Sequence, residues 1–494
     1  MLDRNNINNY FIKKGYNPLL DPEALDNNQE DKSYQRDVYL LANQLAERFE
    51  SNYIIDIGCR NIKQLEKINK KFCVLGIAAG KNSKQFREKY SEGIWIEHNI
   101  DSSEELLLPV EYLKNSVIIC TDLIERLKHP EYLLYNFKKM MNHAAVVLLS
   151  TPERDLVRGL NDYGPPADKS HVREWNKEEF TYMLQDFDFN IEFIGLTFNN
   201  QVVAEKKTIL SIIANNNYRF AKKDEFKVVA IITVFNEEDI ISHAIKKLLD
   251  QDIYVYIVDN WSTDGSFKII EGFKGQKNFI GLERFPQAAP ASTFNLISLL
   301  QRVEELTRTI EADWFIHQDA DEIRMAPWNL SLKDAIIYVD SLGFNAIDHT
   351  VVNFYPVDNN FSKGNHEEYM KYFDFGRLQG DFFQIKAWKN TGKRISLAIH
   401  GGHLVGFEGR RIFPYKFINK HYPIRSQKQG ELKIFKYRKP RWNKKERERG
   451  WHMHYDHIKE GYSFIHDPEN LEKYINDDDF RSRYLVEIIS GVGI

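Results

Sequence analysis

Residues 314–322 read Trp-Phe-Ile-His-Gln-Asp-Ala-Asp-Glu, an apolar run followed directly by acidic side chains. A short run of this kind predicts a buried strand, so Asp319 and Asp321 follow the carboxyl end of that strand. Two carboxylates two residues apart can hold one hard divalent cation together with diphosphate oxygens. Because the same spacing also occurs in solvated turns, the stretch alone leaves both interpretations open.

Two similar clusters precede this stretch. The apolar run 228–234 leads into Phe235-Asn236-Glu237-Glu238, and the run 253–258 leads into Asp259-Asn260-Trp261-Ser262-Thr263-Asp264-Gly265-Ser266. Helical patterns at 238–249, 265–273 and 293–309 lie between the runs, which predicts an α/β domain with a mostly parallel sheet. Ligands bind beyond the carboxyl ends of such strands, near the point where strand order reverses. The second cluster could also be a helix N-cap, but three clusters in order favour one shared site.

The first half of the chain shows a separate strand–helix series. Strand-like runs occur at 53–57, 72–77, 94–97, 117–120, 145–150, 191–198 and 208–214. The polar stretch 216–226 predicts a linker. We therefore expect two α/β domains, 30–215 and 227–494, the first of them Rossmann-like.

Composition excludes some classes of protein. The 494 residues include 67 Lys and Arg against 71 Asp and Glu, and a net charge of −4 gives no indication of nucleic-acid binding. Cys59, Cys73 and Cys120 lie in or beside apolar runs and are expected to be free thiols in a reducing compartment. The N-terminus lacks the apolar stretch of a signal peptide, and no segment is apolar enough to span a bilayer. We expect a cytoplasmic enzyme, with peripheral contact at the inner face of the membrane left open.

The order V-F-N-E, D-N-W-S-T-D-G-S and H-Q-D-A-D-E resembles the family 2-like glycosyltransferases of the GT-A fold, over residues 226–430. The resemblance implies a UDP- or GDP-linked sugar donor and a glycan or lipid-linked acceptor. It implies that Val234, Asn236 and Glu237 flank the nucleobase, and that Asp259 contacts the nucleoside.

The resemblance also implies a metal site. Asp319 and Asp321 would bind Mn²⁺ or Mg²⁺ together with the donor diphosphate, and the metal would neutralise the charge of the leaving group. A late histidine often completes the metal shell in related enzymes. His421 is the first candidate and His403 the second, while a structural role in a β-hairpin is the alternative for either.

Inverting members of this group use a carboxylate to deprotonate the acceptor. Asp381 precedes an apolar run and is our choice for this base, with Glu367, Glu368 and Asp374 as the other candidates. The basic, aromatic stretch 433–457 could bind diphosphate or an anionic lipid surface, or form a solvated helix face.

Tyr53-Ile54-Ile55-Asp56-Ile57-Gly58-Cys59 and Asp122-Leu123-Ile124-Glu125 resemble motifs of class I S-adenosylmethionine-dependent methyltransferases, over residues 30–215. The resemblance implies a cofactor site built from Asp56, Gly58, Asn99 and Asp122. Several positions depart from the family pattern, namely Arg60 for a second glycine, Ala78-Ala79 for the ribose carboxylate, Asn99 for an aspartate and Arg126 for the motif histidine. These departures favour weakened or lost methyl transfer.

Together the patterns predict a metal-dependent glycosyltransferase fused to a methyltransferase-like domain, acting on surface polysaccharide or another glycoconjugate. One alternative is a bifunctional glycosyltransferase and methyltransferase. The other is a non-catalytic scaffold that binds glycan or nucleotide.

Overall fold

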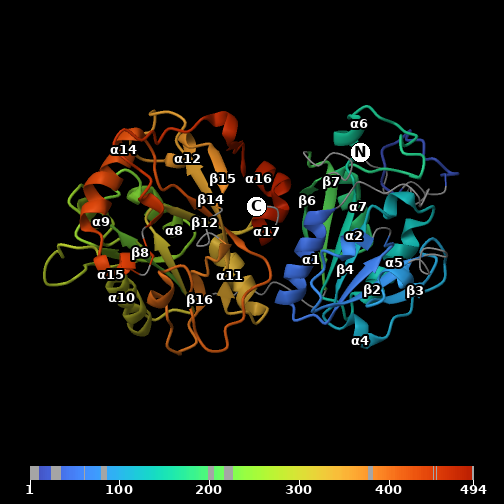
Figure 1. The fold of residues 1–494 in the computed structure, drawn as a ribbon, viewed down its shortest axis with the longest axis horizontal. Helices are drawn as coiled ribbons and strands as arrows, with labels where there is room; N and C mark the ends of the chain where they lie inside the picture. Colours follow the sequence, from blue (N-terminus) through green and yellow to red (C-terminus); the bar gives the residue numbers. More distant parts are fainter. Residues whose placement is uncertain are drawn as a thin grey trace. The chain divides into compact units, whose positions relative to one another are not determined.

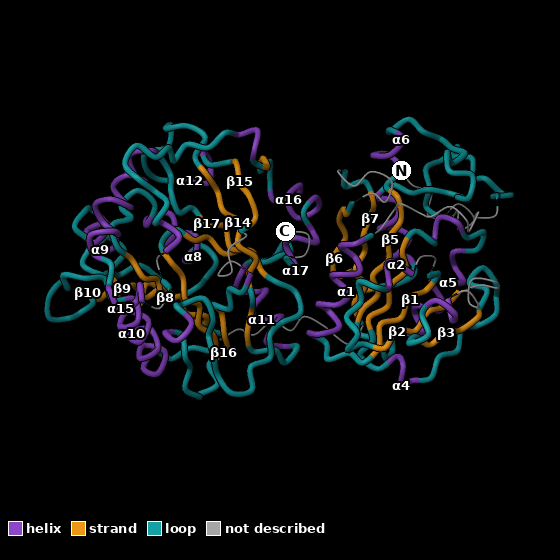
Figure 2. Tube along the Cα trace, viewed as in Figure 1, coloured by secondary structure: helices purple, strands orange, loops and turns teal. Residues whose placement is uncertain are grey.

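A computed structural model of the chain describes residues 10–23, 35–59, 62–78, 86–198, 205–215, 226–376, 382–448, 450–451 and 453–491. The chain divides into two compact units, the first comprising Met1–Arg219 with Asp477–Gly493 and the second Phe220–Asn476. In each unit the strands lie inside and helices flank them (Figures 1 and 2). Both units are α/β, as predicted. Most of the expected linker 216–226 falls outside the described residues.

The first unit is built on one seven-stranded sheet of order β3-β2-β1-β4-β5-β7-β6. Five strands are parallel, and β7 runs antiparallel to both β5 and β6. The strands are β1 (Tyr53–Ile57), β2 (Cys73–Ala78), β3 (Ile94–Glu97), β4 (Val117–Thr121), β5 (Val146–Pro152), β6 (Asn190–Thr197) and β7 (Thr208–Ala214). The helices are α1 (Arg36–Arg48), α2 (Ile62–Leu65), α4 (Val110–Leu113), η2 (Ile124–Arg126), α5 (Pro130–Met140), α6 (Arg154–Arg158), α7 (Lys177–Asp186), α16 (Asp477–Arg483) and α17 (Leu485–Ser490).

Alternate strand residues pack against different helices, because successive side chains point to opposite faces of a sheet. Ile55 and Ile57 of β1 belong to a core that also contains the apolar sides of α5 and α7. Helix α1 packs on β1 and β4 and also contacts α17. All three cysteines are free thiols.

The last helices belong to the first unit, whereas the expected second domain ran to residue 494. Both α16 and α17 pack on β6. Gly195 of β6 makes this close approach possible, because a Cβ there would lie 2.7 Å from the Ser482 carbonyl oxygen and 2.8 Å from Leu485 Cβ. An ion pair between Lys206 and Glu487 also fixes α17.

The second unit contains two sheets, of orders β10-β9-β8-β11-β16-β13 and β12-β17-β14-β15-β18. The first is parallel from β10 to β11, and β16 joins β11 antiparallel. The strands are β8 (Val228–Val234), β9 (Tyr254–Asp259), β10 (Phe279–Arg284), β11 (Trp314–Asp319), β12 (Glu322–Met325), β13 (Ala346–Ile347), β14 (His349–Tyr355), β15 (Tyr372–Phe375), β16 (Ala387–Lys389), β17 (Phe417–His421) and β18 (Glu472–Lys473).

The helices of the second unit cover its sheets. They are α8 (Ile241–Leu249), α9 (Ser266–Glu271), α10 (Leu296–Thr309), α11 (Leu332–Ser341), α12 (His366–Tyr369), α14 (Gln427–Glu431) and α15 (Lys444–Glu448), with shorter turns at η3 (Ala398–His400), η4 (Leu432–Arg438), η5 (Lys439–Arg441), η6 (Met453–Tyr455) and η7 (Pro468–Asn470). Helix α10 begins later than predicted because the side chain of Asn295 accepts the Ser298 N–H and caps it. No described helix has the length and apolarity to cross a membrane.

Candidate functional site

The three polar clusters of the second unit follow β8, β9 and β11. Strand β8 lies between the other two and pairs in parallel with both. The chain passes from β8 to β9 and β10 on one side and then crosses back to β11 on the other, so strand order reverses at β8. This is the position at which open α/β sheets bind ligands.

The first two clusters are hydrogen-bonded to each other. Asn236, with a φ of 55°, accepts the Thr263 N–H at 2.7 Å and donates to the Thr263 hydroxyl at 3.1 Å. The Glu237 N–H donates to Ser266 Oγ at 2.8 Å. Val234 and Asn236 are buried. Sequence resemblance placed these residues beside a nucleobase, and the structure shows them as the link between two loops at the sheet edge.

Asp259 is fully enclosed at the end of β9. Its carboxylate accepts the Ser262 N–H at 3.1 Å and lies 3.6 Å from Arg284 Nε. Burial raises the pKa of Asp259, although the Ser262 hydrogen bonds act in the opposite direction. The Arg284 guanidinium also packs on the rings of Trp261 and Phe267, at 4.8 and 3.8 Å from the ring centroids. Asp259 therefore braces the turn after β9.

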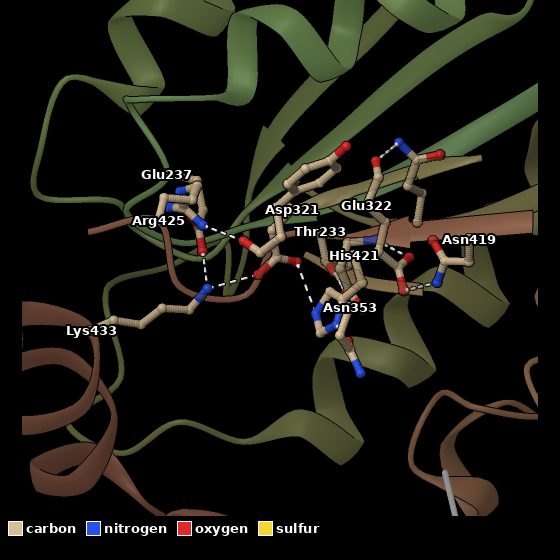
Figure 3. Close-up of polar contacts among 12 residues, drawn as sticks. Thr233, Glu237, Asp321, Glu322, Asn353, Asn419, His421, Arg425 and Lys433 are labelled. Atoms are coloured by element: carbon tan, nitrogen blue, oxygen red, sulfur yellow. Dashed lines mark hydrogen bonds and ion pairs between the residues drawn. The ribbon is translucent and has the colours of Figure 1, made fainter. Parts of the chain in front are cut away.

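Buried lysines neutralise the acidic cluster after β11, and Figure 3 shows one of them, Lys433, beside Asp321. Lys386 Nζ lies 2.9 Å from Asp319 Oδ2, whose other oxygen accepts the Thr233 hydroxyl at 3.1 Å. Lys433 Nζ donates to Asp321 Oδ2 at 2.7 Å and to Glu237 Oε1 at 2.9 Å. Burial alone would raise the pKa of Asp321, but Lys433 and then His421 outweigh it and hold that pKa well below its usual range.

Arg425 completes this network from the segment after β17. Its fully buried guanidinium donates to Glu237 Oε2 at 2.5 Å and to both oxygens of Asp239. Glu237 thus bonds two cations and links the first cluster to the third. Its side chain, which the sequence resemblance would place beside a nucleobase, lies within this ion network.

His421 lies next to Asp321, as the predicted ligand set requires. Its Nε2 is 3.9 Å from Asp321 Oδ1, and its Nδ1–H donates to Asn353 Oδ1 at 2.7 Å. Strand pairing places His421 opposite Glu322 on β12. The second candidate, His403, instead accepts a hydrogen bond from Gln384 Nε2 at 2.7 Å.

A divalent cation does not fit these residues well. Among the described residues, no three His, Cys, Asp or Glu side chains form a set that could hold a metal. Asp319 and Asp321 each bond a lysine instead. A divalent ion on the other oxygen of Asp321 would lie within roughly 7 Å of the Lys433 ammonium, where repulsion is about 5 kcal/mol at an effective dielectric of about 20.

The base predicted from the sequence, Asp381, lies outside the described residues. Glu367 is held by His243 at 2.9 Å and Lys247 at 2.8 Å, and Glu368 is exposed. Asp374 is placed differently from both. Strand register sets it opposite Asn353, which in turn lies opposite His421 on the next strand. Residues directly opposite each other share a face of the sheet, so Asp374 lies in the row that runs through Asn353 and His421 to Glu322.

The predicted cofactor residues of the first unit mostly lie at the carboxyl ends of β1 and β4. Gly58 follows β1 with a φ of 81°, and Asp56 accepts the Tyr39 hydroxyl at 2.8 Å. Asp122 also has a positive φ, of 46°, and accepts from Gln35 Nε2 at 2.7 Å. Helix α1 and the residue before it supply both donors. Asn99, the fourth predicted residue, is exposed beyond β3.

A second polar cluster lies beside Asp122, around the buried His171. His171 Nδ1 is 2.7 Å from Glu174 Oε1, while its Nε2 lies 3.3 Å from Asp168 and 3.8 Å from Glu125. Glu125 is fully buried and accepts the Thr151 hydroxyl at 2.9 Å. Arg126 also approaches Glu125 and Asp168, at 3.7 and 3.8 Å. The sequence contained these residues as motifs, but their convergence appears only in the fold.

Comparison with known proteins matches two families to the chain. The family described as "Methyltransferase domain" matches residues 30–192, and "Glycosyl transferase family 2" matches 229–295. The first match gives no support to the expected loss of methyl transfer. No curated protein matches the chain.

Solved structures that resemble the chain do so at low identity. A SAM-dependent methyltransferase from Aquifex aeolicus is 12% identical, with a TM-score of 0.24, over 33% of this chain and 81% of that one. The plantazolicin methyltransferase BamL is 15% identical, with a TM-score of 0.28, over 37% and 85%. TarS of S. aureus is 16% identical, with a TM-score of 0.22, over 33% and 28%.

Proposed function

Because the chain carries a methyltransferase domain in its N-terminal part and a glycosyl transferase family 2 domain at residues 229–295, we propose that its second unit transfers a sugar from a UDP- or GDP-linked donor to a glycan or glycoconjugate. The observation that carries the proposal is the convergence of three polar clusters at the carboxyl ends of β8, β9 and β11. The first two clusters lie inside the matched residues.

In this reaction an acceptor oxygen forms a bond to the anomeric carbon of the donor sugar. The bond from that carbon to the diphosphate oxygen breaks, and its electron pair leaves with the nucleoside diphosphate. Positive charge near the diphosphate lowers the barrier, because negative charge develops on it in the transition state. Lys433 and Lys386 hold such charge beside Asp321 and Asp319.

A carboxylate would take the proton of the acceptor hydroxyl. Asp381 remains the sequence-based candidate for this base. Asp374 is the better-placed candidate among the described residues, because it shares the row of Asn353 and His421. Attack from the side opposite the leaving group would invert the anomeric centre.

The proposal can be tested by incubating the full chain with a panel of UDP- and GDP-sugars. A true donor should raise the melting temperature, because ligands that bind the folded state stabilise it. Release of the nucleoside diphosphate in the presence of glycan acceptors should follow, and it should fall in Asp321→Asn. Asp252→Asn is the control, because Asp252 is exposed, bonds Lys277, Asn278 and Lys333, and precedes β9, whose opposite end carries the second cluster. Full activity in Asp321→Asn would overturn the site assignment.

Methyl transfer is a second candidate function, which would make the chain bifunctional. The methyltransferase match over 30–192 favours it, together with the positive φ of Gly58 and Asp122 beside the predicted cofactor residues. His171, held by Glu174, would be the group that accepts the proton of the methylated substrate. Calorimetry with S-adenosylmethionine tests this. If the chain binds neither S-adenosylmethionine nor any sugar donor, the alternative that remains is a non-catalytic scaffold.

A further inference from the structure

We propose that Lys433 and Lys386 replace the divalent cation at the acidic cluster, so that the second unit binds a nucleoside diphosphate without a metal. The inference rests on the proposed glycosyl transfer and specifies how its donor is held. It departs from the metal-dependent site that the two aspartates suggested in the sequence.

Lys433 holds one of the two carboxylate oxygens that Asp321 could offer to a metal. Its Nζ bridges Asp321 and Glu237 at 2.7 and 2.9 Å, and its side chain is 7% exposed. It projects from η4 into the space between the first and third clusters, as Figure 3 shows. An ammonium so enclosed is already desolvated, so it can contact a phosphate oxygen without losing much further hydration.

Lys386 does the same for Asp319. Its Nζ bonds Asp319 at 2.9 Å and Glu322 at 3.1 Å, and its side chain is 3% exposed. The Asp319 side chain remains 45% exposed, so a ligand in solvent can reach this pair. Each aspartate of the motif therefore has its own lysine.

Every carboxylate of the cluster has a cationic partner. Glu237, Asp239, Asp319, Asp321 and Glu322 each form an ion pair with one or more of four cations, namely Arg324, Lys386, Arg425 and Lys433. A site that concentrates a divalent cation normally presents a larger excess of carboxylate charge. Five carboxylates against four cations leave an excess of one.

The segment that carries Lys433 brings further cations to the same edge of the sheet. Arg438 donates to the Tyr455 hydroxyl at 2.9 Å. Arg441 packs on the ring of Phe235 at 4.0 Å and donates to Asn260 at 3.2 Å. Phe235 and Asn260 belong to the first and second clusters, so η4 and η5 place positive charge over both. A nucleoside diphosphate carries the complementary charge.

Calorimetry with UDP and GDP on the full chain tests the inference. In EDTA, one of the two should bind, with a Kd within about threefold of its value in Mn²⁺. Binding that requires Mn²⁺ would overturn the inference and leave glycosyl transfer standing. Failure of both nucleotides to bind under either condition would overturn the proposed function and the inference with it.

Variants of Lys433 sharpen the test. Lys433→Gln should weaken binding in EDTA by roughly tenfold to a hundredfold, the usual effect of losing one charge-assisted hydrogen bond. Lys459→Gln, an exposed change in the same C-terminal part of the unit but outside the basic stretch 433–457, should leave it unchanged. The double variant Glu237→Gln/Lys433→Gln removes one positive and one negative charge together. It shows whether a loss of nucleotide binding comes from misfolding or from the missing ammonium. The Lys433→Gln protein should also bind Mn²⁺, which electron paramagnetic resonance detects as a loss of the signal of the free ion. Unchanged nucleotide affinity in both Lys433 variants would overturn the inference.

Discussion

The buried Lys386 and the partly exposed Asp319 form an ion pair in which Nζ lies 2.9 Å from Oδ2, although 67 residues separate them in the chain. The pairing of β16 with β11 brings them together, because Lys386 directly precedes β16 and Asp319 ends β11. Lys386 also bonds Glu322, so one ammonium fixes two carboxylates beside the proposed donor site.

Replacing Lys386 with Met should therefore destabilise the second unit and reduce donor binding. Removing one partner of a buried ion pair costs about 3–5 kcal/mol, because it leaves uncompensated charge. Tryptophan fluorescence during urea unfolding reports mainly on this unit, which holds six of the eight tryptophans. Lys389→Met is the matched control, since Lys389 pairs with Asp340 but is 40% exposed. Equal losses in both variants would contradict a special role for Lys386.

The sequence sufficed for the local pattern of the fold. The run 228–234 became β8 with the same bounds, and the run 253–258 became β9 shifted by one residue. Such patterns depend on neighbours along the chain. The three clusters could be found for the same reason, because each directly follows its strand.

The partners of those clusters could not be read from the sequence. Lys433 lies 112 residues from Asp321, and Arg425 lies 188 residues from Glu237. No local periodicity encodes such pairs, so an acidic motif was interpreted as a metal site without its lysines. The position of helices α16 and α17 could not be predicted for the same reason. They pack on β6, which lies almost 300 residues earlier in the chain.

Glu367 should contribute to stability and not to catalysis. Burial would raise its pKa, but the hydrogen bond from His243 and the charges of Lys420 and Lys247 hold that pKa well below its usual range. A carboxyl group with a depressed folded-state pKa stabilises the protein above its unfolded-state pKa of about 4.3, and the contribution is lost as pH falls below that value.

Glu367→Gln should therefore lower the free energy of unfolding by about 3 kcal/mol at pH 7, with a smaller difference below about pH 4. Urea unfolding across that range measures it. Glu368→Gln, at the exposed neighbouring position, should stay within about 0.5 kcal/mol of the unchanged protein at every pH. A Glu367 effect that does not depend on pH would show that the lost contribution is not electrostatic.

Asp374→Asn and Asp381→Asn together should identify the general base. The base should lose roughly a hundredfold to ten-thousandfold in kcat with little change in donor affinity, because it acts on the acceptor proton. We expect this loss in Asp374→Asn, since Asp374 shares the sheet row of Asn353 and His421. Steady-state kinetics with a saturating donor separates kcat from binding. A loss confined to Asp381→Asn would restore the sequence-based assignment.

Gly58→Ala should abolish binding of S-adenosylmethionine to the first unit. The turn after β1 holds Gly58 at a φ of 81°, with its N–H donating to the Ile77 carbonyl at 2.9 Å. A Cβ there would lie 2.5 Å from Leu123 Cδ2, and a positive φ itself costs an alanine roughly 1–2 kcal/mol. Because Leu123 follows Asp122, the clash would disturb Asp122 as well as Gly58.

Gly159→Ala separates the clash from the strain. Gly159 has a similar φ of 91°, but a Cβ there would meet nothing within 4 Å. Gly58→Ala should lose more stability in thermal unfolding because it has the clash as well as the strain, and only Gly58→Ala should lose cofactor binding in calorimetry. If Gly58→Ala binds S-adenosylmethionine as well as Gly159→Ala does, the turn after β1 is not the cofactor site. If the unchanged chain binds none, the residues around Asp56 and Asp122 serve the fold, as the departures at Ala78 and Arg126 suggested.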